Sequence, residues 1–430
     1  MSQFIITGGH PLQGTITASG NKNAALALLP ACLLTEEPVT LHNIPDIQDV
    51  RTTLAILRDL GVKVEPLGPG SWRIQADTVR TNVLNRELAA RIRASFVFSG
   101  PLLARSGGIS LPIPGGDVIG GRPLDTHIQG LRALGAQVRL DEREGLFHME
   151  GDHLNGAGYL LQAEASVTGT ENTVMAAALA EGTTIIDNAA SEPHVRDLCN
   201  LLNQMGARIE GVGTNRLIIE GVERLSGGEF RIGADFMEVG SFIGAAAVTG
   251  GEIRIRQASP HDLRMIRLVY GRLGVIWEEE GDDVIVPARQ PLEVEFALGG
   301  RIPEIKPLPW PGFPPDLMSI AVVIATQSRG SVLLHDWMYE SRFFFVDKLK
   351  FMGARVVLCD PHRVLVNGPC DLYANPHGVT SPDIRAGMAM VLAALCAPGT
   401  TVIHNIQQID RGYERVEEKL QKLGASIERT

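Results

Sequence analysis

The sequence predicts a layered α/β protein of two domains, each built from three copies of one supersecondary unit. The main observation is a phrase of Leu or Met, then Gly, then a short apolar run, which occurs six times in the 430 residues. Its glycines are 74, 71, 68, 79 and 71 residues apart, and such a spacing indicates one unit that has been copied. β-like segments and helical stretches alternate between the phrases, which favours layered α/β architecture. The six phrases begin at Leu60, Leu134, Met205, Leu273, Met352 and Leu423.

The first element expected in several copies is a buried helix. Its residues are small and apolar with few charges, which is typical of a helix packed on most sides. We expect such helices over residues 23–34, 171–179 and 385–397.

The next element is a short β-like segment rich in Val, Ile and Thr, which are residues that favour strands. Five copies show it, at residues 38–41, 183–186, 252–255, 331–334 and 400–403. In the second copy we expect the stretch 112–127 to replace this strand.

An amphipathic helix precedes each phrase. In the last copy the apolar residues recur at steps of four and three, at Ile409, Tyr413, Val416, Leu420 and Leu423. This pattern predicts one helix with a buried stripe. Gly424 then supplies a residue that tolerates the left-handed backbone of a helix end. In the first copy we expect Asp49 to be the N-cap.

Composition excludes several classes of function. The net charge of −10 argues against non-specific binding of nucleic acid. The five cysteines are scattered without a CxxC pair, and HExxH is absent, so we expect no disulfide framework, no metal and no cofactor. No apolar run reaches the ~18 residues of a membrane span, and no signal peptide is visible. We therefore expect a cytoplasmic protein with no membrane partner, whose anion sites depend on individual Lys and Arg residues.

Three stretches go beyond what packing requires. The first, residues 19–25, places Lys22 in the first turn of an apolar helix after a flexible turn. Free backbone N–H groups, the helix dipole and an ammonium there would bind an anion. The alternative is a Gly turn, an Asn cap and a solvated Lys.

The second stretch, residues 112–127, has four Gly and three Pro around Asp117. This composition suggests an exposed loop that carries Asp117 over a substrate as a general acid. The alternative is an ordinary turn Asp.

The third stretch, residues 409–415, places Asp410 and Arg411 at an expected helix start. The helix dipole disfavours a positive charge at a helix start, so Arg411 suggests that this position binds a ligand. The alternative is an ordinary exposed Arg.

Together these stretches resemble the UDP-N-acetylglucosamine 1-carboxyvinyltransferases, the enolpyruvyl transferases that begin peptidoglycan synthesis and so serve cell-wall biogenesis, cell shape and cell division. The resemblance runs from about Phe4 to Arg429, and its strongest pieces are residues 19–25, 93–95, 114–127, 383–386 and 409–415. The 5-enolpyruvylshikimate-3-phosphate synthases share the six-repeat fold, but the loop at 114–127 and the run at 409–415 belong to the nucleotide-sugar enzymes.

The resemblance implies a two-domain inside-out α/β barrel fold with six βαβ-type repeats, three in each domain. One domain would span residues 22–230. The other would combine residues 1–21 with 231–430, because the family's N-terminal strand belongs to the second domain. The two crossings would form a hinge, with the ligands in the cleft.

The implied reaction transfers enolpyruvyl from phosphoenolpyruvate to the 3-hydroxyl of the UDP-N-acetylglucosamine sugar and releases phosphate. It proceeds by addition and elimination through a tetrahedral ketal. This chemistry needs cations around the phosphate and carboxylate, an acid for C3 of phosphoenolpyruvate and a base for the sugar hydroxyl.

The resemblance assigns these roles to residues of this chain. Asp117 would be the acid, Asp316 the base, and Asp383 would assist at the reacting centre. The phosphate would be held by Lys22, Arg93, Arg122 and Arg411, and the carboxylate or ketal by Arg342 and Arg385. On the nucleotide-sugar side the implied residues are Asn23 for the sugar, Pro123, Leu124 and Asp125 for uracil, and Ser166 and Val167 for the diphosphate.

The chain departs from the family pattern at several positions. Asp117 replaces the usual Cys that the epoxide fosfomycin alkylates, and some members naturally carry Asp, so we expect an active, fosfomycin-insensitive enzyme. Pro315 replaces the usual Thr before the base. The nucleotide side is altered at Gln48, Glu164, Thr168 and Phe236. Three other functions stay open: a relative that acts on another nucleotide or nucleotide sugar, a non-catalytic nucleotide-sugar-binding protein, and a transferase with a shikimate-type acceptor.

Overall fold

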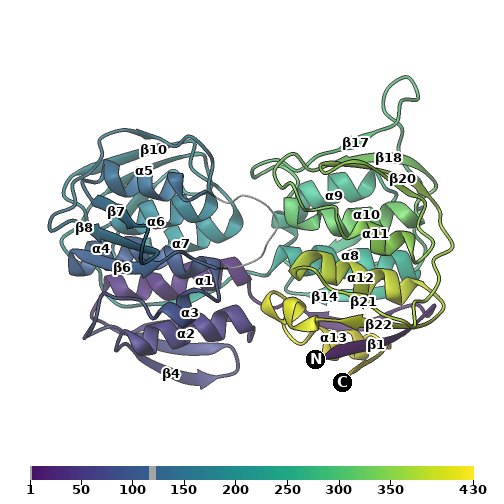
Figure 1. Cartoon of the computed structure of the whole chain (residues 1–430), viewed down its shortest axis with the longest axis horizontal. Coiled ribbons are helices and arrows are strands. Elements are labelled where there is room, and N and C mark those ends of the chain that lie inside the picture. Colours follow the sequence, from purple (N-terminus) through teal and green to yellow (C-terminus); the bar gives the residue numbers. More distant parts are fainter. Residues whose placement is uncertain (1, 116–122) are drawn as a thin grey trace. The chain divides into compact units, whose positions relative to one another are not determined.

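The computed structural model describes residues 2–115 and 123–430, which form two compact units (Figure 1). The first unit comprises residues 20–115 and 123–233, and the second comprises residues 2–19 and 234–430. Within these described residues, every helix is too short or too polar to cross a membrane.

Each unit contains three small sheets that share one strand order. In five of the six sheets an outer strand pairs in parallel with the second strand. The second, third and fourth strands then pair antiparallel with one another in that order. The sixth sheet, β6-β8-β7, has an isolated parallel bridge between Val83 and Ser110 in place of the outer strand. The six sequence copies are therefore six copies of one sheet.

The first unit contains strands β3 (Val39–His42), β4 (Lys63–Gly68), β5 (Ser71–Gln75), β6 (Gly108–Pro112), β7 (Gln137–Asp141), β8 (Leu146–Glu150), β9 (Leu160–Leu161), β10 (Thr183–Asp187), β11 (Arg208–Glu210), β12 (Arg216–Glu220) and β13 (Gly228–Arg231). Its helices are α1 (Lys22–Ala31), α2 (Gln48–Asp59), α3 (Arg86–Ala89), α4 (Ser99–Ser106), α5 (Asp125–Ala133), α6 (Val167–Ala177) and α7 (Pro193–Gln204), with 3₁₀ helices η1 (Cys32–Leu34) and η2 (Arg93–Phe98).

The second unit contains strands β1 (Gln3–Gly8), β2 (Gln13–Thr17), β14 (Glu252–Arg256), β15 (Glu278–Glu280), β16 (Asp283–Val286), β17 (Glu304–Ile305), β18 (Gly330–His335), β19 (Val356–Asp360), β20 (Arg363–Gly368), β21 (Val379–Thr380), β22 (Gly399–His404) and β23 (Ser426–Arg429). Its helices are α8 (Phe236–Thr249), α9 (Arg264–Gly271), α10 (Met318–Gln327), α11 (Val346–Lys350), α12 (Ile384–Cys396) and α13 (Val416–Lys422), with 3₁₀ helices η3 (Pro260–Leu263), η4 (Pro315–Leu317) and η5 (Ile406–Arg411).

The N-terminal chain completes two sheets of the second unit. Strand β1 lies between β22 and β23, where Ile5 is opposite Val402 on one side and Glu428 on the other. Strand β2 pairs in parallel with β14. The sixth copy therefore uses a strand from the other end of the chain.

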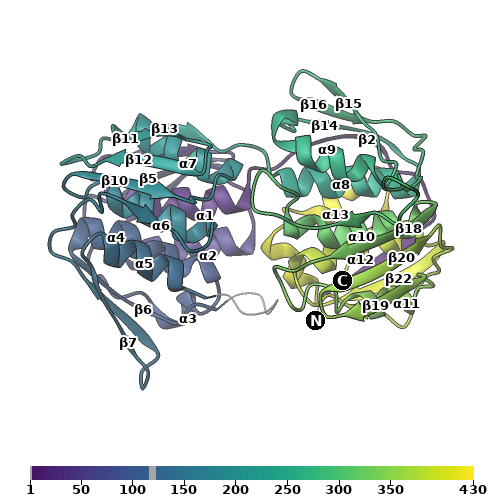
Figure 2. The same cartoon turned by 90° about the horizontal axis from the view of Figure 1, so that it is seen from above.

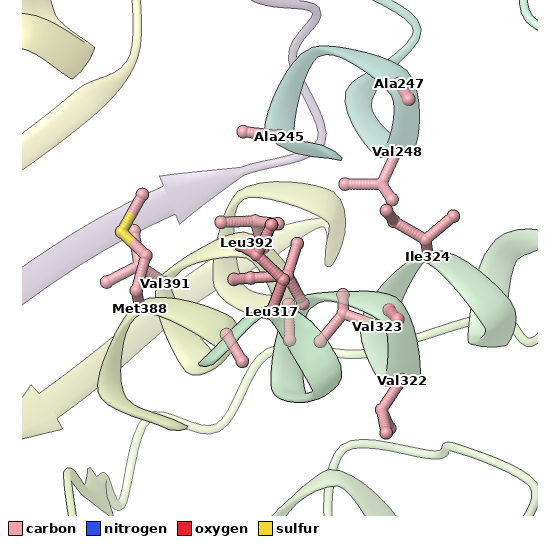
Figure 3. Packing of buried hydrophobic residues seen from close by; sticks show 14 of the residues in the cluster. Ala245, Ala247, Val248, Leu317, Val322, Val323, Ile324, Met388, Val391 and Leu392 are labelled. Atoms are coloured by element: carbon pink, nitrogen blue, oxygen red, sulfur yellow. The ribbon is translucent and has the colours of Figure 1, made fainter. Parts of the chain in front are cut away.

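The apolar helices lie inside each unit and the sheets lie outside (Figure 2). In the second unit α8, α10 and α12 pack against one another, and their buried apolar side chains, such as Val248 beside Ile324, fill the space between them (Figure 3). These helices are apolar on all sides, so they are stable only where neighbours cover every face. This arrangement is the predicted inside-out α/β barrel.

The structure confirms most of the local predictions. The five β-like segments form β3, β10, β14, β18 and β22. The apolar stretch 23–34 forms α1 and then the 3₁₀ helix η1, and the stretches 171–179 and 385–397 lie mostly in α6 and α12. The glycine of every phrase adopts a left-handed backbone, with φ between +78° and +102° at Gly61, Gly135, Gly206, Gly274, Gly353 and Gly424. The repeated phrase therefore marks a helix end, as was predicted for Gly424 in the last copy.

Four local predictions were wrong. The second copy keeps its strand, as β6, because the segment lies just before the stretch 112–127. The last copy is not one helix, because Arg415 has φ +42° and separates η5 from α13. Arg411 consequently ends a 3₁₀ helix instead of starting an α-helix. Asp49 is not an N-cap, since α2 begins at Gln48 after Ile47.

The repeated cap glycine can be tested where no side-chain space is lost. A Cβ at Gly424 would meet no atom within 4 Å, so Gly424→Ala should cost only the left-handed strain, about 1–2 kcal/mol. We expect a lower midpoint of thermal unfolding, measured by calorimetry. Gly271→Ala, in open space at the end of α9 with ordinary φ, is the control and should not lower the midpoint. Equal midpoints for the two variants would contradict the cap.

Candidate functional site

The short helix η4 presents Asp316 in the second unit. Pro315 is its first residue, a position where the N–H that proline lacks has no helical partner and where the fixed φ suits the helix. Proline before Asp316 is therefore compatible with the local backbone. The Asp316 carboxylate is 29% exposed, so it is held by the protein and still open to solvent.

The start of α12 presents Arg385. Asp383 is the N-cap, and its Oδ1 accepts hydrogen bonds from the N–H groups of Arg385 and Ala386 at 2.8 and 2.9 Å. Through Oδ1, Asp383 therefore fixes the first turn of α12, which carries Arg385.

Asp316 joins two buried arginines. Its Oδ1 accepts a hydrogen bond from Arg342 Nη2 at 3.1 Å, and its Oδ2 accepts one from Arg385 Nε at 2.9 Å. The two arginine side chains are only 1% and 6% exposed. Two guanidinium groups on one carboxylate form a strong, charge-assisted arrangement suited to binding a planar anion.

Neighbouring groups keep both guanidinium groups charged despite burial. The Arg342 guanidinium lies 5.0 Å from the Tyr339 ring centre, and that of Arg385 lies 5.2 Å from the Tyr413 ring centre. Burial opposes the charge of Arg342, but the carboxylates around it outweigh burial and raise its pKa. The pKa of Arg385 is also raised against burial, by Tyr413 and Asp316 in particular.

Asp336 is a further carboxylate beside Arg342, completing what we call the Asp316 cluster: Asp316, Asp336, Arg342 and Arg385. Asp336 Oδ2 lies 3.6 Å from Arg342 Nε, and its side chain is fully buried. Its Oδ1 accepts hydrogen bonds from the N–H groups of Met338 and Tyr339. Burial raises the pKa of Asp336, and Arg342 offsets this shift only in part.

Two other residues of this unit have different surroundings. Arg411 is half-buried at the end of η5 and donates a hydrogen bond to Gln408 Oε1 at 3.2 Å. Phe236, at the family's usual Arg position, is buried at the start of α8 with its ring 5.5 Å from Trp310. The side chain at 236 therefore belongs to the core.

The first unit presents Lys22 at the start of α1. Asn21 is the N-cap, and its Oδ1 accepts a hydrogen bond from Ala24 N–H at 3.0 Å. Lys22 is buried, and its Nζ lies 2.9 Å from Asp49 Oδ2. Asn23 is half-buried beside it. A Cβ at Gly20 would lie 1.6 Å from Asn43 O, so close packing rather than flexibility requires this glycine.

The predicted uracil and diphosphate residues lie at the starts of two packed helices. Leu124 and Asp125 begin α5, and Ser166 and Val167 begin α6, with the Ser166 hydroxyl accepting a hydrogen bond from Gly169 N–H. Arg93, at the start of η2, donates to Pro123 O at 3.5 Å. The fold therefore gathers these residues at one place in the first unit.

A buried hydrogen-bond chain fixes the two helix starts. Asn172 Oδ1 accepts a hydrogen bond from Gly100 N–H at 2.7 Å, which sets the amide so that Nδ2 donates to His127 Nδ1 at 2.9 Å. Burial, helped by Arg93, lowers the pKa of His127 to about 3, so the ring is neutral. His127 Nε2–H consequently donates to Thr168 Oγ1 at 3.0 Å and links α5 to α6.

The remaining predicted residues are less informative. Gln48 and Glu164 are exposed. Asp117 and Arg122 lie outside the described residues, so their roles rest on the sequence.

The sequence interpretation missed several residues that support the site. Asp49 was interpreted as a cap, yet it is the partner of Lys22. Asp336 and Asn172 carried no motif, and Tyr413 was assigned only to an apolar stripe. The one clue to these residues is a chemical rule: a buried cation requires a nearby carboxylate or aromatic face.

Residues 6–420 match the family model described as EPSP synthase (3-phosphoshikimate 1-carboxyvinyltransferase). A UDP-N-acetylglucosamine 1-carboxyvinyltransferase of Treponema denticola is 54% identical, covering 100% of this chain and 99% of the relative. One of Bradyrhizobium diazoefficiens is 52% identical, covering 99% and 98%.

Solved structures show the same fold at low identity. The enolpyruvyl transferase NikO from Streptomyces tendae superposes with a TM-score of 0.88 at 23% identity over 100% of this chain and 99% of that chain. An EPSP synthase from Acinetobacter baumannii gives 0.76 at 18% identity over the full length of both. By family model and full-length identity, the chain belongs to the UDP-N-acetylglucosamine 1-carboxyvinyltransferases, within the EPSP synthase family.

Proposed function

We propose that this protein transfers the enolpyruvyl group of phosphoenolpyruvate to the 3-hydroxyl of UDP-N-acetylglucosamine and releases phosphate, the first committed step of peptidoglycan synthesis. Full-length relatives with this name support the reaction. The five free cysteines fit a reducing cytoplasm, where we place the enzyme.

The observation that carries the proposal is the Asp316 cluster. Two buried guanidinium groups form a receptor for a carboxylate, and a partly exposed carboxylate lies within hydrogen-bond reach of both. A receptor for the carboxylate of phosphoenolpyruvate and a base for a hydroxyl are two of the groups that the reaction needs.

The proposed addition step conserves atoms and charge. Asp316 accepts the proton of the 3-hydroxyl while that oxygen bonds to C2 of phosphoenolpyruvate. The electrons of the C2–C3 double bond take up a proton at C3 from Asp117. Arg342 and Arg385 hold the carboxylate, while Lys22, Arg93, Arg122 and Arg411 hold the phosphate and balance its charge.

The proposed elimination step then restores the double bond. The Asp117 carboxylate takes a proton back from C3, the C2–O bond to phosphate breaks, and phosphate departs with the bonding electrons and the proton that Asp316 had accepted. The enolpyruvyl ether remains on the sugar. On the acceptor, Asn23 holds the sugar, Pro123, Leu124 and Asp125 hold uracil, and Ser166 and Val167 hold the diphosphate. Asp383 contributes by holding the first turn of α12 and, with it, Arg385.

A second candidate acceptor is favoured by specific substitutions. Glu164 is exposed where the family often has a basic residue, and Phe236 is buried against Trp310. Fewer cations on the nucleotide side would suit an acceptor other than UDP-N-acetylglucosamine. The same transfer chemistry would then act on another nucleotide or nucleotide sugar.

An acceptor series tests the proposed function. We expect phosphate release from phosphoenolpyruvate with UDP-N-acetylglucosamine and none with UDP-N-acetylgalactosamine, UMP or shikimate 3-phosphate, measured by a coupled phosphate assay. Release only with another nucleotide would assign the second candidate. No release with any acceptor, together with retained nucleotide-sugar binding, would make the protein a binding module.

The base is tested by Asp316→Asn. An amide cannot accept the hydroxyl proton, so kcat should fall by about 10²–10⁴. Asp347→Asn, which changes an exposed carboxylate on α11, is the matched control and should keep kcat. A kcat for Asp316→Asn within a few-fold of the unmodified enzyme would remove Asp316 from the role of base.

The acid is tested with fosfomycin and Asp117→Asn. A carboxylate is a poorer nucleophile than a thiolate toward the epoxide, so preincubation with the drug should leave activity unchanged over time. Asp117→Asn should abolish most turnover, because an amide cannot protonate C3. Time-dependent inactivation, or an active Asp117→Asn enzyme, would contradict the assignment.

A further inference from the structure

Arg342 contacts two carboxylates with opposite accessibility. Asp336 is fully buried, whereas the Asp316 side chain is 29% exposed. Asp316 also contacts Arg385, and Asp336 does not share that contact in the described structure. The two carboxylates therefore differ in how readily an incoming anion can replace them.

Asp336 is anchored to the backbone around it. Its Oδ1 accepts two N–H groups, its own N–H donates to His362 O at 2.8 Å, and His362 Nδ1 contacts Asp336 O at 2.8 Å. Its Oδ2 has no hydrogen-bond donor within the described chain, and it faces Arg342 Nε, which likewise lacks an acceptor there. The fixed charge of Asp336 is therefore directed at Arg342.

Asp316 occupies the position that an anionic ligand would take. Its two oxygens each accept a hydrogen bond from a different guanidinium, a pattern also suited to a small carboxylate. Removing one partner of a buried ion pair without replacement costs about 3–5 kcal/mol, so two buried arginines need an anion between them. Exchanging one carboxylate for another keeps both arginines paired.

We propose that Asp316 is an internal occupant of the carboxylate site: the carboxylate of the substrate displaces it from Arg342 and Arg385, while Asp336 stays and holds Arg342 in place. This inference rests on the proposed function for the identity of the substrate carboxylate and for the base. Displacement frees the Asp316 oxygens from both guanidinium groups. Asp316 then becomes an available base only after the enolpyruvyl donor has bound, which prevents unproductive deprotonation. Asp336 is a positioning residue, because it acts through Arg342.

Two probes and two variants of the full chain test the exchange by calorimetric binding. The probe 2-phospholactate carries both a phosphate and a carboxylate, and ethyl phosphate carries the phosphate alone. We expect Asp316→Asn to bind 2-phospholactate at least about fivefold more tightly, because the internal competitor, which pairs with both arginines, is gone. Its affinity for ethyl phosphate should not change.

Asp336→Asn should shift affinity in the opposite direction. Without the fixed partner of Arg342, 2-phospholactate should bind at least about tenfold more weakly, while ethyl phosphate binds as before. A merely structural defect would weaken both probes. Asp347→Asn controls for the change in net charge and should alter neither probe.

The proposal is overturned if Asp316→Asn weakens the binding of 2-phospholactate, or if it tightens both probes equally, as a general field effect would. It is also overturned if a folded Asp336→Asn binds 2-phospholactate like the unmodified protein. If Asp336→Asn does not fold, the Asp316→Asn result decides. These binding measurements do not need turnover. If no acceptor supports phosphate release but the binding results hold, the proposed function is contradicted and the exchange is not.

Discussion

Buried positive charge is the constraint on which the described functional regions depend. Arg342, Arg385 and Lys22 are each less than a tenth exposed, inside units whose buried residues are mostly apolar. An unpaired charge there would cost several kcal/mol, so each cation lies against a carboxylate. Lys22 lies against Asp49, and Arg342 and Arg385 lie against Asp316.

The inside-out arrangement supplies Lys22 and Arg385 at helix starts. Because the central helices are covered on every side, their first turns are where polar groups can reach a ligand. Asn21, Ser166 and Asp383 cap α1, α6 and α12, and each cap fixes the backbone next to a residue with a proposed role. One structural unit, copied six times, therefore yields several positions for polar residues, and differences between copies decide which of them bear function.

Much of the fold and part of the site could be predicted from the sequence. The phrase spacing predicted the repeats, and the left-handed φ of Gly424 follows from its place after an apolar stripe. Lys22 and Arg385 could be identified by resemblance to a family. Asp336 could not, because its importance comes from lying 3.6 Å from Arg342 in the folded chain. The break at Arg415 was missed because the stripe stays buried across it.

The sequence by itself determined the number of repeats, the type of most main elements and the family. These are local properties, set by apolar periodicity, glycine at helix ends and motif identity within short windows. Tertiary structure alone decided the pairing of charges. Asp49 lies beside Lys22, and Asp316 bridges Arg342 and Arg385, which follow it by 26 and 69 residues. The physical reason is that electrostatic partners are selected by distance and burial in space, and a linear pattern specifies neither.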